Sequence, residues 1–244
     1  MVTVRAVSRA LSVLRAFKPE QPDLSLAEIA QATGLDKATT RRLLVTLIEE
    51  GVVRQIALTQ RYALTLGILA LAAAVHTGGL REEARPVMAA LARASGVTVF
   101  LSIPDPQGAL CLERMHGADP VQVRWWNVGQ HMPWDQGAAT RLLLAYMPPE
   151  QAIAALRRTA GAARNMDSLL SLLPAVRDCG YAVATDDVAI GLSAIAVPVR
   201  DGSGNVIGSL SLGGLTHVVL DGGDRPRALD QLQESAGEIS SHLR

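Results

Sequence analysis

The side chains best suited to binding a polyanion lie in one short run, Lys37-Ala38-Thr39-Thr40-Arg41-Arg42. Arginine can donate to guanine or phosphate oxygens, and threonine can donate to phosphate or contact a thymine methyl. The run has no large apolar side chain, so it can approach base edges without steric conflict. We therefore predict that it contacts double-stranded DNA. The alternative is a solvated helix end that carries an arginine pair by chance.

Two short helices are predicted to position this run. Ser25 and Glu28 form a capping box at the start of the first, and Gly34 ends it. Asp36 can cap the second helix, which runs to Gly51. Two helices joined by such a turn form a helix-turn-helix, whose second helix enters the major groove with its N-terminal part.

A preceding helix is predicted to complete the bundle. Ala10, Leu11, Leu14 and Phe17 recur at helical spacing and are expected to form its buried face. We include Arg9, on the same helix, among the expected DNA contacts.

A β-hairpin wing is predicted after the second helix. Residues 52–56 and 61–64 have the pattern of two short strands, joined by a turn without glycine. Arg54 and Arg61 are expected to meet phosphates or a minor groove. The wing completes a DNA-binding domain over residues 1–64.

An Ala- and Leu-rich helix from Leu64 to Val75, interrupted by Gly78-Gly79, is predicted to link two domains, so that 65–79 is the linker and 80–244 the second domain. Its apolar character on all sides indicates burial against another helix, most simply in a dimer. Packing on its own domain is the alternative.

The formal charge is zero but unevenly distributed. Residues 1–77 hold nine basic and six acidic side chains, whereas residues 78–244 hold fourteen and seventeen. The basic excess lies in the N-terminal part of the chain, which is the part predicted to contact a polyanion. The first residues do not resemble a signal peptide, no apolar stretch is long enough to span a bilayer, and Cys111 and Cys179 form no disulfide framework. We expect a cytoplasmic protein that does not bind membranes.

The second domain is predicted to be α+β, with a largely antiparallel sheet covered by helices, because strands cluster at its two ends with helices between them. The expected strands are 97–103, 109–116, 121–127, 181–185, 192–200 and 206–213. The expected helices are 81–95, 137–147, 149–158, 167–179 and 225–243.

Motifs of common enzymes and cofactor sites are absent, and the five histidines have no zinc-ligand spacing. We therefore expect no enzyme activity, no cofactor and no metal. Two alternatives are kept. One is an enzyme or sensor of another class whose helix-turn-helix contacts protein. The other is a metal sensor that uses Cys111, His116 and His131.

Several segments of the chain have the pattern of a known protein family. In the N-terminal part they are residues 4–11, 26–30, 34–39, 42–47 and 62–64. In the C-terminal part they are residues 128–133, 180–183, 191–199 and 208–214. Through these segments the chain resembles the IclR family of bacterial transcriptional regulators over nearly its full length. It implies a winged helix-turn-helix, a linker helix and a GAF-like effector-binding domain, in homodimers or dimers of dimers. Such a regulator would bind an approximately palindromic operator under control of a small organic or aromatic acid.

The resemblance also implies an effector site. Backbone amides at Gly137, Ala138, Ala139 and Thr140 would hold a ligand carboxylate, which suits a helix N-terminus. Further lining residues would be Met132, Asp186, Asp187, Ser193, Ala194 and Ser211. The chain departs from the family pattern here, because Thr140 replaces a usual glycine, Arg141 a usual lysine, and Trp134-Asp135 a usual leucine-histidine pair.

Three of the eight aromatic residues, Trp125, Trp126 and Trp134, lie within ten residues beside this site. We hypothesise that Trp126 and Trp134 line the cavity and favour a planar ligand. Core or interface packing is the alternative. Because neighbours on a strand point to opposite faces, at most one of Trp125 and Trp126 should face the ligand.

Overall fold

A computed structural model describes residues 4–73, 79–120, 123, 126–159, 166–220 and 228–243. The chain divides into two compact units, residues 1–76 and 77–244. The division falls inside the stretch 65–79 that we expect to link the domains. Each unit is described by itself.

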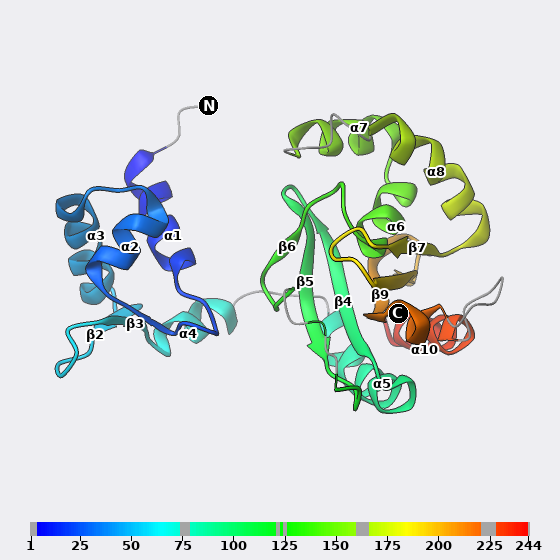
Figure 1. Ribbon diagram of the computed structural model, residues 1–244, viewed down its shortest axis with the longest axis horizontal. Helices are drawn as coiled ribbons and strands as arrows, with labels where there is room; N and C mark the ends of the chain where they lie inside the picture. The colour runs from blue at the N-terminus through cyan, green and yellow to red at the C-terminus, as the bar shows by residue number, and fades with distance from the viewer. Residues whose placement is uncertain are drawn as a thin grey trace. The chain divides into compact units, whose positions relative to one another are not determined.

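The first unit is a three-helix bundle with a small antiparallel sheet (Figure 1). Its elements are α1 (Arg5–Ala16), β1 (Asp23–Leu24), α2 (Leu26–Thr33), α3 (Lys37–Glu49), β2 (Val53–Gln55), β3 (Tyr62–Leu64) and α4 (Gly67–Ala73). The sheet order is β1-β3-β2, so β2 and β3 form the predicted wing against a short strand that precedes α2.

The local signals around the helix-turn-helix are confirmed. Ser25 and Glu28 form the capping box of α2, and Gly34 ends that helix in the left-handed region. Asp36 caps α3. The wing turn closes without glycine because Gln60 adopts a φ of 55°.

The predicted buried face of α1 is wrong at one position. Leu11 is 44% exposed, whereas Val13 is fully buried. Val13 belongs to the buried cluster of the first unit, together with Phe17, which follows α1, and residues of α2 and α3.

The second unit contains a six-stranded sheet in the order β6-β5-β4-β9-β8-β7, and every neighbouring pair is antiparallel. The strands are β4 (Thr98–Asp105), β5 (Gly108–Met115), β6 (His131–Met132), β7 (Ala182–Thr185), β8 (Leu192–Arg200) and β9 (Val206–Leu215). The helices are α5 (Leu80–Ser95), α6 (Ala138–Tyr146), α7 (Pro149–Arg158), α8 (Met166–Cys179), α9 (Thr216–Val219) and α10 (Ala228–His242). The predicted α+β architecture is confirmed.

Helices cover both faces of this sheet (Figure 1). One buried cluster joins α6, α7 and α8 to one face, and a second joins α5 and α10 to the other. Side chains along β9 alternate between the two faces of the sheet, and Leu210 and Leu212 belong to the α5/α10 cluster. Ser211, between them, therefore faces α6.

The predicted strand 121–127 is not observed at the positions that the structure describes. Val123, Trp126 and Asn127 lie outside any strand, and Trp125 lies outside the described residues. The edge strand is instead β6, which pairs with β5 through only two residues, Met132 with Ala109 and His131 with Leu110.

Candidate DNA-binding surface and effector cavity

A hollow of about 740 Å³ lies between α1 and the outer side of α3. Five of the predicted DNA-contacting residues line it: Arg9, Ala38, Thr39, Arg41 and Arg42. Lys37 is exposed at the start of α3 and Arg54 on β2. The structure therefore gathers basic and small side chains on the exposed part of the predicted recognition helix.

The N-terminus of α3 is capped by the side chain of Asp36, the residue directly before the helix. Asp36 Oδ1 accepts from the Thr39 amide at 2.8 Å, and Oδ2 accepts from the Thr39 hydroxyl at 2.8 Å. These bonds, that from the Thr39 amide first, lower the pKa of Asp36. The cap holds the first turn of α3 in one conformation.

Thr40 does not belong to this surface, which corrects our expectation. It is fully buried, and its hydroxyl donates to the Asp36 carbonyl at 2.9 Å. Position 40 follows the capped turn on the inner side of α3, in phase with the buried Leu44 and Leu47.

Arg61 was expected to meet phosphate, and the structure corrects this as well. Its guanidinium pairs with Asp23 Oδ1 and with Glu28 Oε2, the latter at 2.9 Å from Nη2. It also donates to the Asp23 carbonyl at 3.0 Å. The hydrogen bond to Asp23 is the main cause that raises the pKa of Arg61. Arg61 therefore ties the wing to α2.

A partly open cavity of about 60 Å³ lies in the second unit between α6 and the sheet. Nine of the twelve predicted effector-site residues line it: Trp126, Met132, Gly137, Ala138, Ala139, Asp187, Ser193, Ala194 and Ser211. The other lining residues, which sequence reasoning missed, are Phe100, Val123, Ala184, Val188, Leu192 and Gly213.

One wall of the cavity is aromatic. Phe100 stacks on Trp126 with ring centroids 5.2 Å apart and an interplanar angle of 29°. Phe100 is paired with Ser211 in the sheet, which places both side chains on the face of the sheet that borders the cavity. The hypothesis that Trp126 lines the cavity therefore agrees with the structure. Phe100 was missed because only the pairing of β4 with β9 brings it there.

Ser211 is a polar residue of this wall. It is 2% exposed and lines the cavity, and within the described ranges no hydrogen bond of its hydroxyl is found. Ser193, by contrast, bonds to Thr185 and Thr216 at 3.3 and 3.0 Å. The Ser211 hydroxyl can therefore donate to a polar ligand atom or accept from one.

The N-terminus of α6 opens onto the cavity and lacks a local side-chain cap. Gly137, with a φ of 83°, donates its amide to Asp187 Oδ2 at 3.1 Å. Arg141 Nη2 donates to the same oxygen at 2.5 Å. The side chain that binds at the start of α6 is therefore that of Asp187, fifty positions from Gly137 in the sequence.

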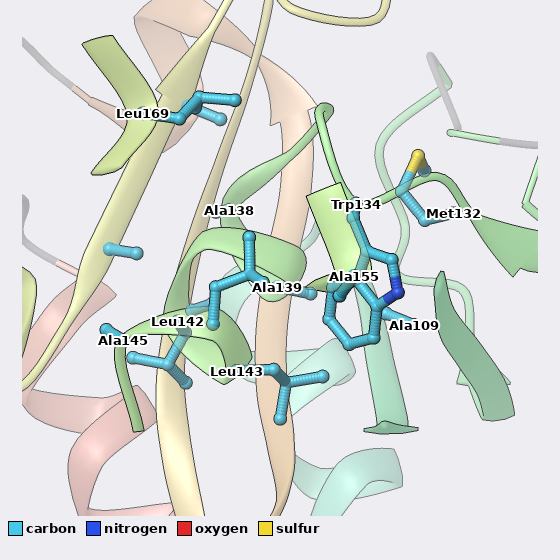
Figure 2. Close-up of a cluster of buried hydrophobic side chains, with 14 of the residues drawn as sticks. Ala109, Met132, Trp134, Ala138, Ala139, Leu142, Leu143, Ala145, Ala155 and Leu169 are labelled. Carbon is cyan, nitrogen blue, oxygen red and sulfur yellow. The ribbon is translucent and has the colours of Figure 1, made fainter. Parts of the chain in front are cut away.

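Trp134 is outside the cavity, contrary to our hypothesis. It is 2% exposed and lies in the buried cluster with Ala139, Leu142 and Ala155 (Figure 2). It borders instead a shallow cleft with Pro104 and Arg158. A turn that follows β6 is closed by the hydrogen bond from the Gln136 amide to the Pro133 carbonyl at 3.1 Å, and of the two residues only Met132 lines the cavity.

Thr140 and Asp186 are also not in the cavity wall. The Thr140 hydroxyl is buried and donates to the carbonyls of Gln136 and Gly137, within the first turn of α6. Asp186 is exposed with a φ of 58°, and its Oδ1 accepts from the Gly191 amide at 2.7 Å. This bond folds residues 186–191 back, which carries the next residue, Asp187, to α6.

The metal-sensor alternative has no geometric support in the part of the chain that the structure describes, where no group of three metal-ligating side chains occurs. Cys111 is buried, which raises the pKa of its thiol to about 12, and a neutral thiol is a poor metal ligand. The Nε2 atom of His131 lies 2.9 Å from Asp105 Oδ1. In the same described part, no helix is long and apolar enough to cross a bilayer.

Two family models match the two units. The IclR helix-turn-helix domain matches residues 6–57, and the C-terminal domain of the bacterial transcriptional regulator IclR matches residues 72–241. The chain belongs to the IclR family. It is thus a DNA-binding transcriptional regulator, as the resemblance implied.

Curated relatives of this IclR-family regulator align along nearly their whole length. The HTH-type transcriptional regulator XynR of Escherichia coli is 27% identical over 100% of this chain and 98% of its own. The glycerol operon regulatory protein of Streptomyces coelicolor is 29% identical over 98% and 96%. These relatives are transcriptional regulators by name.

Solved structures share the fold of the regulator. An IclR transcriptional regulator from Alicyclobacillus acidocaldarius is 28% identical, with a TM-score of 0.80 and 100% of both chains covered. An IclR homologue from Microbacterium hydrocarbonoxydans, solved with 4-hydroxybenzoate, has a TM-score of 0.83 at 22% identity over 98% and 99%.

Proposed function

We propose that this regulator reads its operator with the hollow between α1 and α3 and with the wing. The observation that carries the proposal is the placement of Arg9, Arg41 and Arg42 around one hollow beside the capped start of α3. Arginines at the N-terminal part of a recognition helix reach base edges and phosphates. Lys37, Ala38 and Thr39 extend this contact, and Arg54 adds one from the wing.

We also propose a homodimer on an approximately palindromic operator, with the linker stretch 65–79 at the contact. Leu66 is 80% exposed and Leu69 62% exposed within this stretch. Such an apolar helix is stabilised by burial against a second copy. A dimer presents two recognition helices at a spacing set by its symmetry, and dimers of dimers remain compatible with it.

The cavity of the second unit is the proposed effector site, and its ligand is a small organic acid. The amides of Ala138 and Ala139 belong to the first turn of α6, where a helix leaves its N–H groups without internal partners. Ser211 adds a hydrogen-bonding group, and Phe100 with Trp126 adds an apolar wall. A relative of the same fold holds such an acid, 4-hydroxybenzoate.

Effector binding is proposed to change DNA affinity by as much as the ligand prefers one arrangement of the dimer over another. No catalytic step, cofactor or metal is part of the proposal. The proposed location is the cytoplasm, where bacterial DNA is accessible.

The DNA contact is tested with Arg41→Ala and Arg42→Ala on a fragment carrying the region upstream of the chain's own gene. A side chain that reads a base costs about 1–3 kcal/mol when removed. One that binds phosphate lowers affinity for all sequences and reduces the salt slope by about one.

Arg15→Ala is the matched control, because Arg15 is exposed on α1 and lies outside the hollow. Affinity measured by fluorescence anisotropy should be unchanged in this variant. Wild-type affinity and salt slope in both Arg41→Ala and Arg42→Ala would contradict the proposal.

A further inference from the structure

The carboxylate of Asp187 gives the effector cavity a charge of its own. Among the described residues that line the cavity, it is the one ionisable side chain. Its side chain is 17% exposed and that of Arg141, its partner, 18%. A ligand at the start of α6 therefore meets a negative group that belongs to the protein.

Two elements hold this carboxylate in place. Its Oδ2 accepts from the Gly137 amide at 3.1 Å and from Arg141 Nη2 at 2.5 Å. Arg141 Nη1 donates in turn to the Val183 carbonyl on β7 at 2.6 Å. The pair thus joins α6 to the edge strand.

The second oxygen of Asp187 has acceptor capacity to spare. Both donors meet Oδ2, and across the described ranges no hydrogen bond to Oδ1 is found. An ionised carboxylate can accept several hydrogen bonds, so Oδ1 can take a donor from a ligand.

An acid in this cavity would bring a second carboxylate close to the first. The amide of Gly137 is already used by Asp187, so a ligand carboxylate is left with those of Ala138 and Ala139, the next two along the chain. Arg141 compensates part of the charge of Asp187, and a proton donor between the two carboxylates would reduce their remaining repulsion. A hydroxyl on the carbon next to the ligand carboxylate is the ligand group nearest to that position.

We propose that the effector is a small 2-hydroxy carboxylic acid and that Asp187 selects it. Its carboxylate binds the amides of Ala138 and Ala139, its hydroxyl donates to Asp187 Oδ1, and its apolar part packs on Phe100 and Trp126. This inference rests on the proposed effector function and names the ligand class of the same site.

The test compares acids that differ only in the hydroxyl. Isothermal titration of the full-length protein uses three pairs: lactate with propionate, mandelate with phenylacetate, and glycolate with acetate. In at least one pair the hydroxy acid should bind about tenfold tighter or more, which is the range for a hydrogen bond to a charged group. Equal affinity within every pair, or no binding of any hydroxy acid, overturns the inference.

The variant Asp187→Asn assigns the preference to this side chain. It removes the charge and keeps one acceptor, so the acid without a hydroxyl should gain affinity. The preference for the hydroxy acid should fall at least about threefold, because charge-assisted hydrogen bonds are roughly twice as strong as neutral ones. Glu150→Gln, which removes a carboxylate from the exposed first turn of α7, should leave the preference unchanged. A preference that persists in Asp187→Asn overturns the role of Asp187.

The two proposals fail in different ways. Tight binding of acids with no effect of the hydroxyl removes the ligand class and leaves the effector function intact. Binding of hydroxy acids that does not change DNA affinity removes the effector function. If Asp187→Asn does not fold, as judged by circular dichroism, the three pairs on the wild-type protein still decide the ligand class.

Discussion

The helices α3 and α6 each begin with an aspartate as a cap, and the two caps differ in where the aspartate comes from. Asp36 directly precedes α3 and accepts from Thr39, three residues away. Asp187 reaches the start of α6 from fifty residues away and needs Arg141 to hold it. A local cap makes a helix end that forms independently of the rest of the domain. A remote cap makes one that depends on the tertiary fold, and it can share that end with a ligand.

The comparison is tested most strongly by Arg141→Ala. This change leaves Asp187 largely buried without its cation, and we expect a loss of about 1–3 kcal/mol of stability, since the pair is partly solvated. Chemical denaturation that resolves the second unit measures it. Arg157→Ala, exposed in the last turn of α7, is the control for loss of an arginine. Equal stability of Arg141→Ala and the control would show that the remote cap does not depend on its partner.

A smaller effect is expected from Asp36→Ala. The amide of Thr39 loses its acceptor, so the first unit should unfold at a lower temperature. Asp36→Asn should keep most of the stability, because asparagine is an equally good cap. Asparagine at position 187 keeps an acceptor but loses the charge that pairs with Arg141, so it should be tolerated less well. Differential scanning calorimetry of these three variants would contradict the distinction between the caps if asparagine were equally harmless at both positions.

The smallest effect concerns pH. Hydrogen bonds from the Thr39 amide and hydroxyl hold the pKa of Asp36 below its ordinary value of 3.8. Those from Ser25, backbone first, hold the pKa of Glu28 below 4.5. A lowered folded-state pKa means that the stabilisation is complete above the ordinary pKa and is lost as the pH falls through the lowered one. Thermal unfolding of the first unit should therefore become easier in that acidic range. The double variant Asp36→Asn, Glu28→Gln should show a flatter profile, and a profile as steep as that of the wild type would contradict this assignment.

The parts of the fold that sequence reasoning predicted correctly are those with local causes. The capping box at Ser25, the cap at Asp36 and the strand Leu192–Arg200 each follow from residues within a few positions. The site was predicted where family resemblance supplied the long-range information, as for Ser211. Thr40 and Trp134 were misplaced, because the side of an element that a residue faces depends on what packs against it.

The bond between Arg141 and Asp187 shows more clearly what sequence reasoning could not predict. Neither residue type nor spacing connects position 141 with 187, and only the folding back of residues 186–191 at Asp186 brings them together. Arg61 is similar, since its role follows from the pairing of β3 with β1, which places it against Asp23 and Glu28. A charged side chain near a predicted binding surface can contact a ligand or form an ion pair within the protein. The side chains that the fold places beside it decide which of the two occurs.

The pairing of β4 with β9 has a consequence for the order in which the nascent chain folds. Ser102 and Ser209, whose hydroxyls meet at 2.8 Å across these strands, are 107 residues apart, so the centre of the sheet cannot form until most of the chain has left the ribosome. The first unit is built from contacts within residues 1–76 and precedes it during synthesis. Each newly made chain therefore carries a folded DNA-reading surface before the domain that would control it exists.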